Sequence, residues 1–532
     1  MKRTLIFILI LNLGLFLFAI LHEWTHYASN IGASKIRKVK RGSTDIGQPH
    51  LGNDVTAEII PDQLRVAYIN PRTPAPVLQE SAIANNHSNT SDSSSVEGAI
   101  ILFCYDREDY LEKTLVSLAS LKGLDQLIVY ISQDGTHAGV AALVERLGKT
   151  LFTPPRARGF VHWQHPRTPL IGPTQPGHAW LSQHYKWGLD RIFLEERHEH
   201  AIILEDDMIF SPDFLTYFQA TAALMQQDPS IWCASSWNDN GHRSLQWDER
   251  KLYRSSYFPG LGWMMRRELW LEIRTQFPKQ AWDHWMRLNT TSKGRDCVVP
   301  EVSRNRNIGE IGANMNAQVF KKYLQNMAWA QEGVDDFGDL QYLIRPNYEK
   351  RMKNLVEMAE VWSGGLQNAA FEPDKVYLVL YLVEEYEALV KPLMLWPFPR
   401  GHQKHLTRIP LQKGVQLLLA DRRACPLLPA HLRVLPDPQL RPTVAERAAN
   451  CSITCRSVGK QCTESNFWFI NSCEVLMQHF PCESGCAVEL GSDIPNYVMD
   501  PNLSTFHSCL IAQQQPRCDA SHGATARLCP CT

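Results

Sequence analysis

The sequence has almost no net charge, no internal repeat and no paired zinc-knuckle cysteines. Its 54 lysines and arginines stand against 55 aspartates and glutamates, which leaves a formal net charge of −1. A chain without an excess of either sign produces no global field that would attract nucleic acid or acidic partners. Nucleic-acid binding is therefore not expected. At ~100–200 residues per domain, the 532 residues suffice for about three folded units.

The 14 cysteines are unevenly distributed along the chain. Ten lie between Cys451 and Cys531, without C-x-x-C pairs and with few histidines nearby, which argues against a zinc module. A segment this small buries too little apolar surface to hold itself together without cross-links. We therefore predict a disulfide-rich module over residues 446–532 in a lumenal compartment. Sequons compatible with a glycosylated lumenal chain begin at Asn86, Asn89, Asn289, Asn450 and Asn502.

One long apolar run lies near the N-terminus. Residues 5–21 are apolar except for Asn12, and two basic residues precede them. A spanning helix needs ~17–25 residues, and basic residues on its N-terminal side favour a cytoplasmic tail and a lumenal remainder. A cleaved signal peptide is the alternative, but this apolar run is long for one and no small-residue cleavage site follows at once. We expect a tail at 1–4, a transmembrane anchor at 5–21 and single-pass type II topology.

The residues that follow the anchor contain a possible zinc-protease pattern. His22-Glu23-Trp24-Thr25-His26 matches H-E-x-x-H, which places two zinc-binding histidines and a general base on one helix. No folded segment surrounds this pattern and no third ligand is evident nearby, so we set the metalloprotease interpretation aside. The polar stretch at 85–95 cannot bury enough to fold, and residues 22–96 are predicted to form a stem.

From Gly98 onward, apolar runs alternate with helical patterns. Continuous apolar runs at 99–104, 127–131 and 201–204 predict strands buried on both faces. Leucines spaced by three and four residues between the first two runs predict a helix. This alternation is typical of a parallel or mixed sheet wrapped by helices. We expect a doubly wound α/β domain over 97–345, then a smaller second domain and linker over 346–445.

Carboxylates follow two of the predicted strands. Asp134 and the run Glu205-Asp206-Asp207 both stand at strand ends, where open parallel sheets bind ligands. Three adjacent carboxylates repel one another, so a cation should offset them, and oxygen ligands suit Mg²⁺ or Mn²⁺. The alternative is a solvated acidic turn before a helix, which is favourable in itself. The local sequence leaves both interpretations open.

A second constellation is Trp282-Asp283-His284-Trp285. A carboxylate between aromatic residues suits a sugar site, because rings stack on pyranose faces and the acid accepts the proton of an attacking hydroxyl. The alternative is an amphipathic helix that buries the two tryptophans. Taken by itself, the sequence of this segment favours this alternative.

Taken together, the motifs of residues 97–345 resemble the inverting N-acetylglucosaminyltransferase I family, the alpha-1,3-mannosyl-glycoprotein 2-beta-N-acetylglucosaminyltransferases. That family also includes the protein O-mannose N-acetylglucosaminyltransferase. The motifs occur in the family's order and at similar spacing. They are residues 104–107, 132–134, 184–187, 205–207, 236–241, 258–263, 282–287, 293–295 and 300–304.

The resemblance implies a GT-A fold, a UDP-N-acetylglucosamine donor and Mn²⁺ as cofactor. By similarity, Asp207 would bind the metal, while Glu205 and Asp206 would contact the ribose and the waters of the metal. The residues implied to hold the nucleotide are Arg107, Asp134, His184 and, near the diphosphate, Asn314.

The resemblance also implies the chemistry on the acceptor side. Asp283 would be the general base that deprotonates the 2-hydroxyl of an α1,3-linked mannose of an N-glycan, with Trp282 in the acceptor site. The product would be a β1,2 linkage formed by one in-line displacement with inversion. Cys233 and Cys297 match a family disulfide. The enzyme would lie in the Golgi membrane with its catalytic part in the lumen.

Departures from the family pattern put the choice of acceptor in doubt. His284 stands where the family has a second aspartate, and Asn314 replaces a serine near the diphosphate. A family disulfide is absent because Gly135 has no thiol. Transfer to O-linked mannose or another mannoside is therefore one alternative, and an inactive glycan-binding protein is another. The cysteine-rich module loosely resembles segments attached to other Golgi glycosyltransferases.

Overall fold

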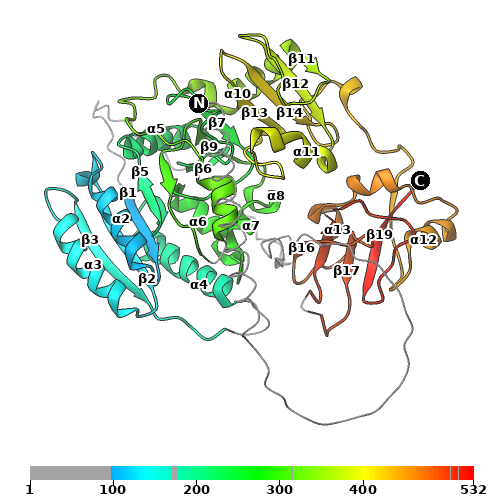
Figure 1. Cartoon of the computed structure of the whole chain (residues 1–532). Helices are drawn as coiled ribbons and strands as arrows, with labels where there is room; N and C mark the ends of the chain where they lie inside the picture. The colour runs from blue at the N-terminus through cyan, green and yellow to red at the C-terminus, as the bar shows by residue number, and fades with distance from the viewer. Residues whose placement is uncertain (1–97, 171–175, 313–314, 504, 513) are drawn as a thin grey trace, which may run out of the picture. The chain divides into compact units, whose positions relative to one another are not determined.

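The computed structural model describes residues 98–170, 176–312, 315–503, 505–512 and 514–532 (Figure 1). The expected tail, anchor and stem, the H-E-x-x-H pattern and Asn314 lie outside these residues. Within the described ranges, no helix is both long and apolar enough to cross a membrane.

An eight-stranded mixed sheet organises the first part of the described chain. Its order is β3-β2-β1-β4-β8-β6-β9-β7, in which β1 to β4 run parallel and β8 is antiparallel to both of its neighbours. The strands are β1 Gly98–Cys104, β2 Ile128–Asp134, β3 Gly159–His165, β4 His200–Glu205, β6 Ile231–Ser235, β7 Leu252–Ser255, β8 Trp263–Arg266 and β9 Asp296–Pro300.

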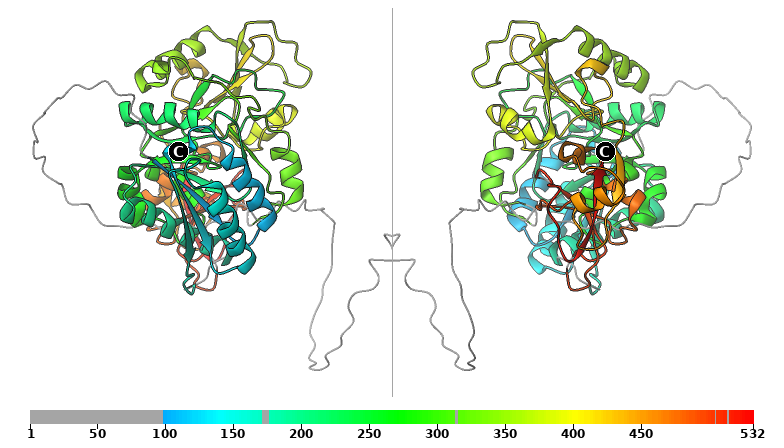
Figure 2. Two further views of the ribbon diagram at one scale, coloured as in Figure 1. Left: turned by 90° about the vertical axis from the view of Figure 1, so that its left-hand side faces the viewer. Right: turned by 90° about the vertical axis from the view of Figure 1, so that its right-hand side faces the viewer.

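Helices cover both faces of this sheet (Figure 1, Figure 2). Side chains of β1 alternate between two cores: Ile100 and Leu102 pack with the leucines of α2, whereas Ile101 and Phe103 pack with Tyr185 of α4. The continuous apolar run therefore forms the doubly buried strand that the sequence predicts. The helices are α2 Glu108–Ala119, α3 Ala138–Leu151, α4 Pro176–Asp190, α5 Phe214–Gln227, α6 Arg267–Ile273, α7 Trp282–Met286 and α8 Asn289–Ser292.

A two-stranded ribbon follows the carboxylate run. β5 (Met208–Phe210) begins directly after Asp207 and pairs antiparallel with β10 (Asn305–Asn307). This pairing brings residues 307–312, far along the chain, against the end of β4.

A second sheet lies in the predicted smaller unit, in the order β11-β12-β14-β13. Its core holds Tyr377, Val379, Leu417 and Leu419, which come from the two central strands of this sheet. The elements are α10 Arg345–Met358, β11 Glu360–Trp362, β12 Val376–Tyr381, α11 Tyr386–Val390, β13 Leu406–Pro410 and β14 Gln416–Asp421.

The cysteine-rich module is a five-stranded sheet in the order β15-β19-β17-β18-β16. All ten of its cysteines are paired, as the predicted disulfide framework requires: 451–529, 455–531, 462–518, 473–486 and 482–509. The elements are β15 Arg441–Val444, α12 Cys451–Ser457, α13 Cys473–His479, β16 Cys486–Glu489, β17 Asn496–Val498, β18 Cys509–Ala512 and β19 Thr525–Cys531.

A further disulfide joins Cys233 of β6 to Cys297 of β9, which lie opposite each other in the first sheet. This bond closes a loop with a sequence separation of 64. Its removal therefore increases the conformational entropy of the unfolded chain. We expect the double variant Cys233→Ala/Cys297→Ala to lose ~2–4 kcal/mol of unfolding free energy. Thermal and chemical unfolding under non-reducing conditions measure this loss, and an unchanged midpoint would contradict it.

Candidate functional site

The candidate site lies at one edge of the first sheet, where the parallel strands β1, β2 and β4 end. Phe103 of β1 stands opposite Glu205 of β4, and Cys104 stands opposite Gln133 of β2. The register therefore places Asp134 and the run Glu205-Asp206-Asp207 at the same edge. This juxtaposition is the one expected for strand ends in an open α/β sheet.

A side chain of the protein itself faces the carboxylate run. Arg107, between β1 and α2, contacts Asp206 through Nη2, and the same nitrogen lies 2.9 Å from Asp207 Oδ2. Its Nη1 donates to the carbonyl of Ile311 at 3.2 Å. Burial lowers the pKa of Arg107, but the neighbouring carboxylates Asp206 and Asp207 outweigh burial and raise it above its ordinary value.

Two carboxyls of the run have a raised affinity for protons. Burial, with a further contribution from Asp207, raises the pKa of Glu205. Burial likewise raises the pKa of Asp206, against the opposing effect of Arg107. The Tyr185 hydroxyl donates to Glu205 Oε1 at 2.6 Å. Such crowding of partly uncompensated charge is common at functional sites.

Asp207 is enclosed by the last residue of β10 and the segment that follows it. Asn307 Nδ2 donates to Asp207 Oδ1 at 3.1 Å, and Ile308 N donates to the Asp207 carbonyl at 2.8 Å. A Cβ on Gly309 would lie 2.1 Å from Asp207 Oδ2, so only glycine permits this approach. The sequence does not single out Asn307 or Gly309, because β10 reaches the site only through its pairing with β5.

The carboxylate run suits a hard divalent cation in ligand chemistry, since its donors are oxygens. However, among the described residues no group of three or more histidine, cysteine or acidic side chains is placed to hold an ion by itself. A cation bound at Asp207 would therefore need further oxygen ligands from a bound molecule. A diphosphate supplies such oxygens.

Asp134 at the end of β2 is held by two basic residues. His165 Nδ1 donates to Asp134 Oδ1 at 2.8 Å, and Arg167 Nη2 donates to Oδ2 at 2.7 Å. Burial raises the pKa of Asp134, but these hydrogen bonds outweigh it and the net pKa is lowered. Arg167 also lies over the ring of Tyr105, 4.1 Å from its centroid. Asp134 is thereby fixed as a carboxylate.

His184 of α4 lies beside this group as a neutral ring. Its Nε2 is 2.8 Å from Ser132 Oγ, and its ring stacks on His165 with centroids 5.3 Å apart. Burial lowers its pKa to about 3. His165 and Arg167 are not expected from the sequence. The available signal is their position at the carboxyl end of β3, which His165 ends and Arg167 follows by two residues.

The segment of Asp283 is tied to the carboxylate run by stacked rings. Trp282 stacks on Tyr185 and Tyr185 stacks on Phe103, each with centroids 4.2 Å apart. Trp282 is only 5% exposed, and the ring of Trp263 also packs near it, with centroids 5.9 Å apart. The Asp283 side chain is 26% exposed and accepts a hydrogen bond from Arg287 Nη1 at 3.0 Å. Asp283 is thus presented at the surface by a buried aromatic support.

Basic and aromatic residues also lie around Asp283. His284 Nε2 lies 3.9 Å from Asp283 Oδ2, and Arg287 lies over the Tyr257 ring at 4.9 Å. Arg400, from the loop before β13, pairs with Asp239 at 2.9 Å. Burial, together with Arg287 and Arg400, lowers the pKa of His284.

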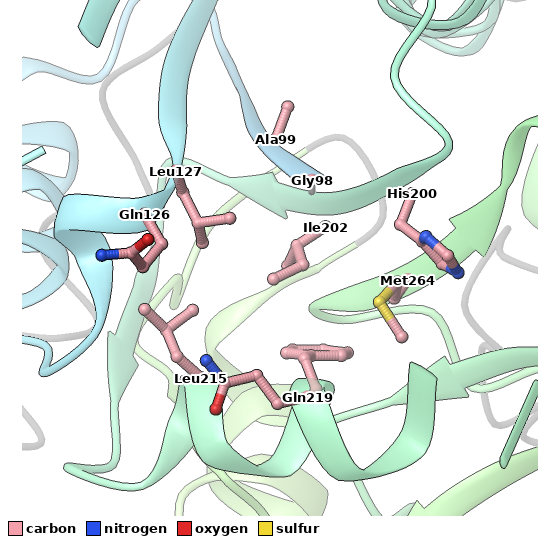
Figure 3. Close-up of a pocket in the computed structure, with 10 residues that line it drawn as sticks. Gly98, Ala99, Gln126, Leu127, His200, Ile202, Leu215, Gln219 and Met264 are labelled. Carbon is pink, nitrogen blue, oxygen red and sulfur yellow. The ribbon is translucent and has the colours of Figure 1, made fainter. Parts of the chain in front are cut away.

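A small apolar cavity lies elsewhere in the sheet (Figure 3). Its lining includes Gly98 and His200, the first residues of β1 and β4, together with Met264. The candidate site lies at the opposite ends of these two strands. The cavity is therefore separate from the carboxylates.

Comparison with known proteins identifies a family, and the curated relatives include a plant enzyme. Residues 15–374 match the model of the GNT-I family. The alpha-1,3-mannosyl-glycoprotein 2-beta-N-acetylglucosaminyltransferase of Arabidopsis thaliana is 38% identical over 273 residues, which are 50% of this chain and 59% of the relative. The chain thus spans less than two thirds of that relative's length.

Similar solved structures include two matches of low similarity. The mannosyltransferase PcManGT from Pyrobaculum calidifontis, in complex with GDP-Man and Mn²⁺, is 14% identical, with a TM-score of 0.28, over 40% of this chain and 59% of its own. Residues 1–349 of S. aureus TarS are 14% identical, with a TM-score of 0.28, over 38% of this chain and 58% of their own. Similarity at this level supports no argument about the site.

Proposed function

Because this chain belongs to the GNT-I family, we propose that it is an inverting N-acetylglucosaminyltransferase. In this proposal N-acetylglucosamine moves from UDP-N-acetylglucosamine to the 2-hydroxyl of an α1,3-linked mannose of an N-glycan, in β1,2 linkage. The main support for the proposal is that Tyr185 links the carboxylate run to the segment of Asp283. Its hydroxyl bonds Glu205 of the run, while its ring supports Trp282 beside Asp283.

The proposed donor site comprises the run and the residues at the ends of β1 and β2. Asp134 and His184 would hold the nucleotide, with Arg107 and Asn314 near the diphosphate. Mn²⁺ bound by Asp207, with Glu205 and Asp206 around its waters and the ribose, would neutralise charge on the departing diphosphate.

Asp283 is the proposed general base. It would accept the proton of the mannose 2-hydroxyl as that oxygen attacks the anomeric carbon from the side opposite UDP, so that the configuration inverts. Arg287 holds one carboxylate oxygen at 3.0 Å, which fixes the orientation of the acid. Trp282 would contribute by supporting Asp283, since its ring stacks on Tyr185 and packs near Trp263.

The family and the expected anchor support a Golgi location with the catalytic part in the lumen, as a single-pass type II membrane protein. Under this proposal the partners are the nucleotide-sugar donor, a mannose-terminated glycoprotein glycan and the membrane.

Purified protein incubated with UDP-N-acetylglucosamine, Mn²⁺ and a mannose-terminated N-glycan should form a β1,2-linked product and release UDP. Mass spectrometry and linkage analysis of the glycan measure the transfer. Omission of Mn²⁺ is the control and should suppress the reaction. If no mannoside acceptor is modified, the proposed activity is wrong. UDP release that depends on Mn²⁺ and acceptor would exclude an inactive glycan-binding protein.

Transfer to O-linked mannose is a second candidate, because His284 rather than an aspartate adjoins the proposed base at 3.9 Å. An O-mannosyl peptide and an N-glycan offered at equal concentration separate the two. The N-glycan should have the larger kcat/KM.

A further inference from the structure

Each oxygen of the carboxylate proposed to bind the metal faces one donor from the protein. Asn307 Nδ2 donates to Asp207 Oδ1 at 3.1 Å, and Arg107 Nη2 lies 2.9 Å from Oδ2. Asn307 belongs to β10 and is buried, whereas the Arg107 side chain is 28% exposed. Of the two donors, Arg107 is the one that can move away.

Arg107 occupies this position as a cation. Its guanidinium is shared between Asp206 and Asp207, so it neutralises part of the charge that would attract a divalent ion. A guanidinium and a divalent cation on the same carboxylate oxygen repel each other. Occupation of Asp207 Oδ2 by one therefore opposes occupation by the other.

The same guanidinium has a second favourable partner in the proposed reaction. Its planar fork of N–H donors matches phosphate oxygens, with which arginine makes strong charge-assisted hydrogen bonds. Its links to Ile311 O at 3.2 Å and to the ring of Tyr110 at 5.3 Å are weak compared with a diphosphate contact. A short rotation would exchange Asp207 for a phosphate on the same side of the site.

We propose that Arg107 acts as an internal counter-cation that keeps free Mn²⁺ off Asp207 until a nucleotide diphosphate draws the guanidinium away. The inference rests on the proposed function, because it takes Asp207 as the metal ligand. It makes metal and donor binding cooperative: each ligand tightens the other by the same factor. It also gives Arg107 opposite effects on the two ligands.

The test is Mn²⁺ binding without donor, measured by electron paramagnetic resonance of the free ion. In wild type this binding should be weak. Arg107→Met should bind Mn²⁺ alone at least tenfold more tightly, while its affinity for UDP-N-acetylglucosamine falls at least tenfold. The factor by which the donor tightens Mn²⁺ should fall accordingly. The matched control is Arg167→Met, which removes an arginine from Asp134 instead; it should weaken donor binding and leave Mn²⁺ binding unchanged.

The outcomes separate this inference from the proposed function. If Arg107→Met binds Mn²⁺ alone no more tightly than wild type, Arg107 is not a competitor of the metal and the inference fails, while the transferase proposal is judged by its own assay. If the tighter binding survives in Arg107→Met/Asp207→Ala, the metal lies elsewhere, and both the metal assignment and the inference fail. Arg107→Gln, which keeps a hydrogen-bond donor for Asp206, replaces the methionine variant if the latter shows no cooperative thermal unfolding.

Discussion

Asp283→Asn is expected to lose transfer by a factor of ~10²–10⁴ while binding of UDP-N-acetylglucosamine persists. The amide has the shape of the carboxylate but cannot accept the proton of the attacking hydroxyl. The donor residues lie at the ends of β1, β2 and β4 and are untouched by the change. Initial rates of glycan transfer, together with calorimetric binding of the donor in Mn²⁺, measure the two effects separately.

The matched control is Asp125→Asn, an exposed carboxylate in the turn before β2, at the sheet edge opposite the site. It should leave both measurements at the wild-type level. Near-normal turnover of Asp283→Asn would refute the assigned base. A parallel loss of donor affinity would show instead that the substitution disturbs the donor site through the aromatic stack.

Asp207→Ala is expected to abolish the part of donor binding that depends on Mn²⁺. Among the described residues no set of three or more metal-binding side chains is available to replace it. The metal would be left with the oxygens of the diphosphate and no protein ligand at this position. Titrations of the donor in Mn²⁺ and in a chelator measure the difference in donor affinity that the metal causes. This difference should vanish in the variant.

Glu310→Ala serves as the control for Asp207→Ala, because Glu310 is an exposed acid of the segment that encloses Asp207. It should retain the dependence of donor affinity on Mn²⁺. If Asp207→Ala retains this dependence too, the metal is bound elsewhere. A thermal unfolding midpoint near that of wild type would confirm that the loss of Asn307's partner has not disrupted the fold.

The sequence predicts the local features of this molecule well, because they depend on neighbouring residues. The apolar run at 99–104 has no polar face, and it forms β1, which is buried on both sides. Asp134 and Glu205 end strands that the sequence identifies, and parallel strand ends meet at one edge. The proximity of these carboxylates therefore follows from the pattern.

Features that depend on distant pairing could not be predicted in the same way. β8 runs antiparallel between β4 and β6, although nothing in its four residues specifies that place. Asn307 reaches Asp207 only through the β5–β10 ribbon. The sequence predicts a divalent cation beside the run and, by resemblance, assigns Arg107 to the nucleotide. The contact of Arg107 with both Asp206 and Asp207 depends on the tertiary structure.

The segment of α7 is compatible both with an amphipathic helix that buries its tryptophans and with a sugar site at Asp283. Trp282 and Trp285 are 5% and 4% exposed, as in an amphipathic helix that buries a tryptophan pair. Asp283 between them remains partly exposed, as a base that meets a substrate must be. Periodicity alone could not separate these roles, because the helix assigns neighbouring residues to different faces.

The order of strands in the cysteine-rich module has a consequence for biosynthesis. β19 lies between β15 and β17, and Cys529 and Cys531 within it pair with Cys451 and Cys455 of α12. Both disulfides of α12 can therefore form only after Cys529 and Cys531 have been synthesised. Until then its thiols are available for exchange with other cysteines. A premature stop before Cys529 would remove both disulfide partners of α12 and the part of β19 that pairs with Arg441–Thr443 of β15.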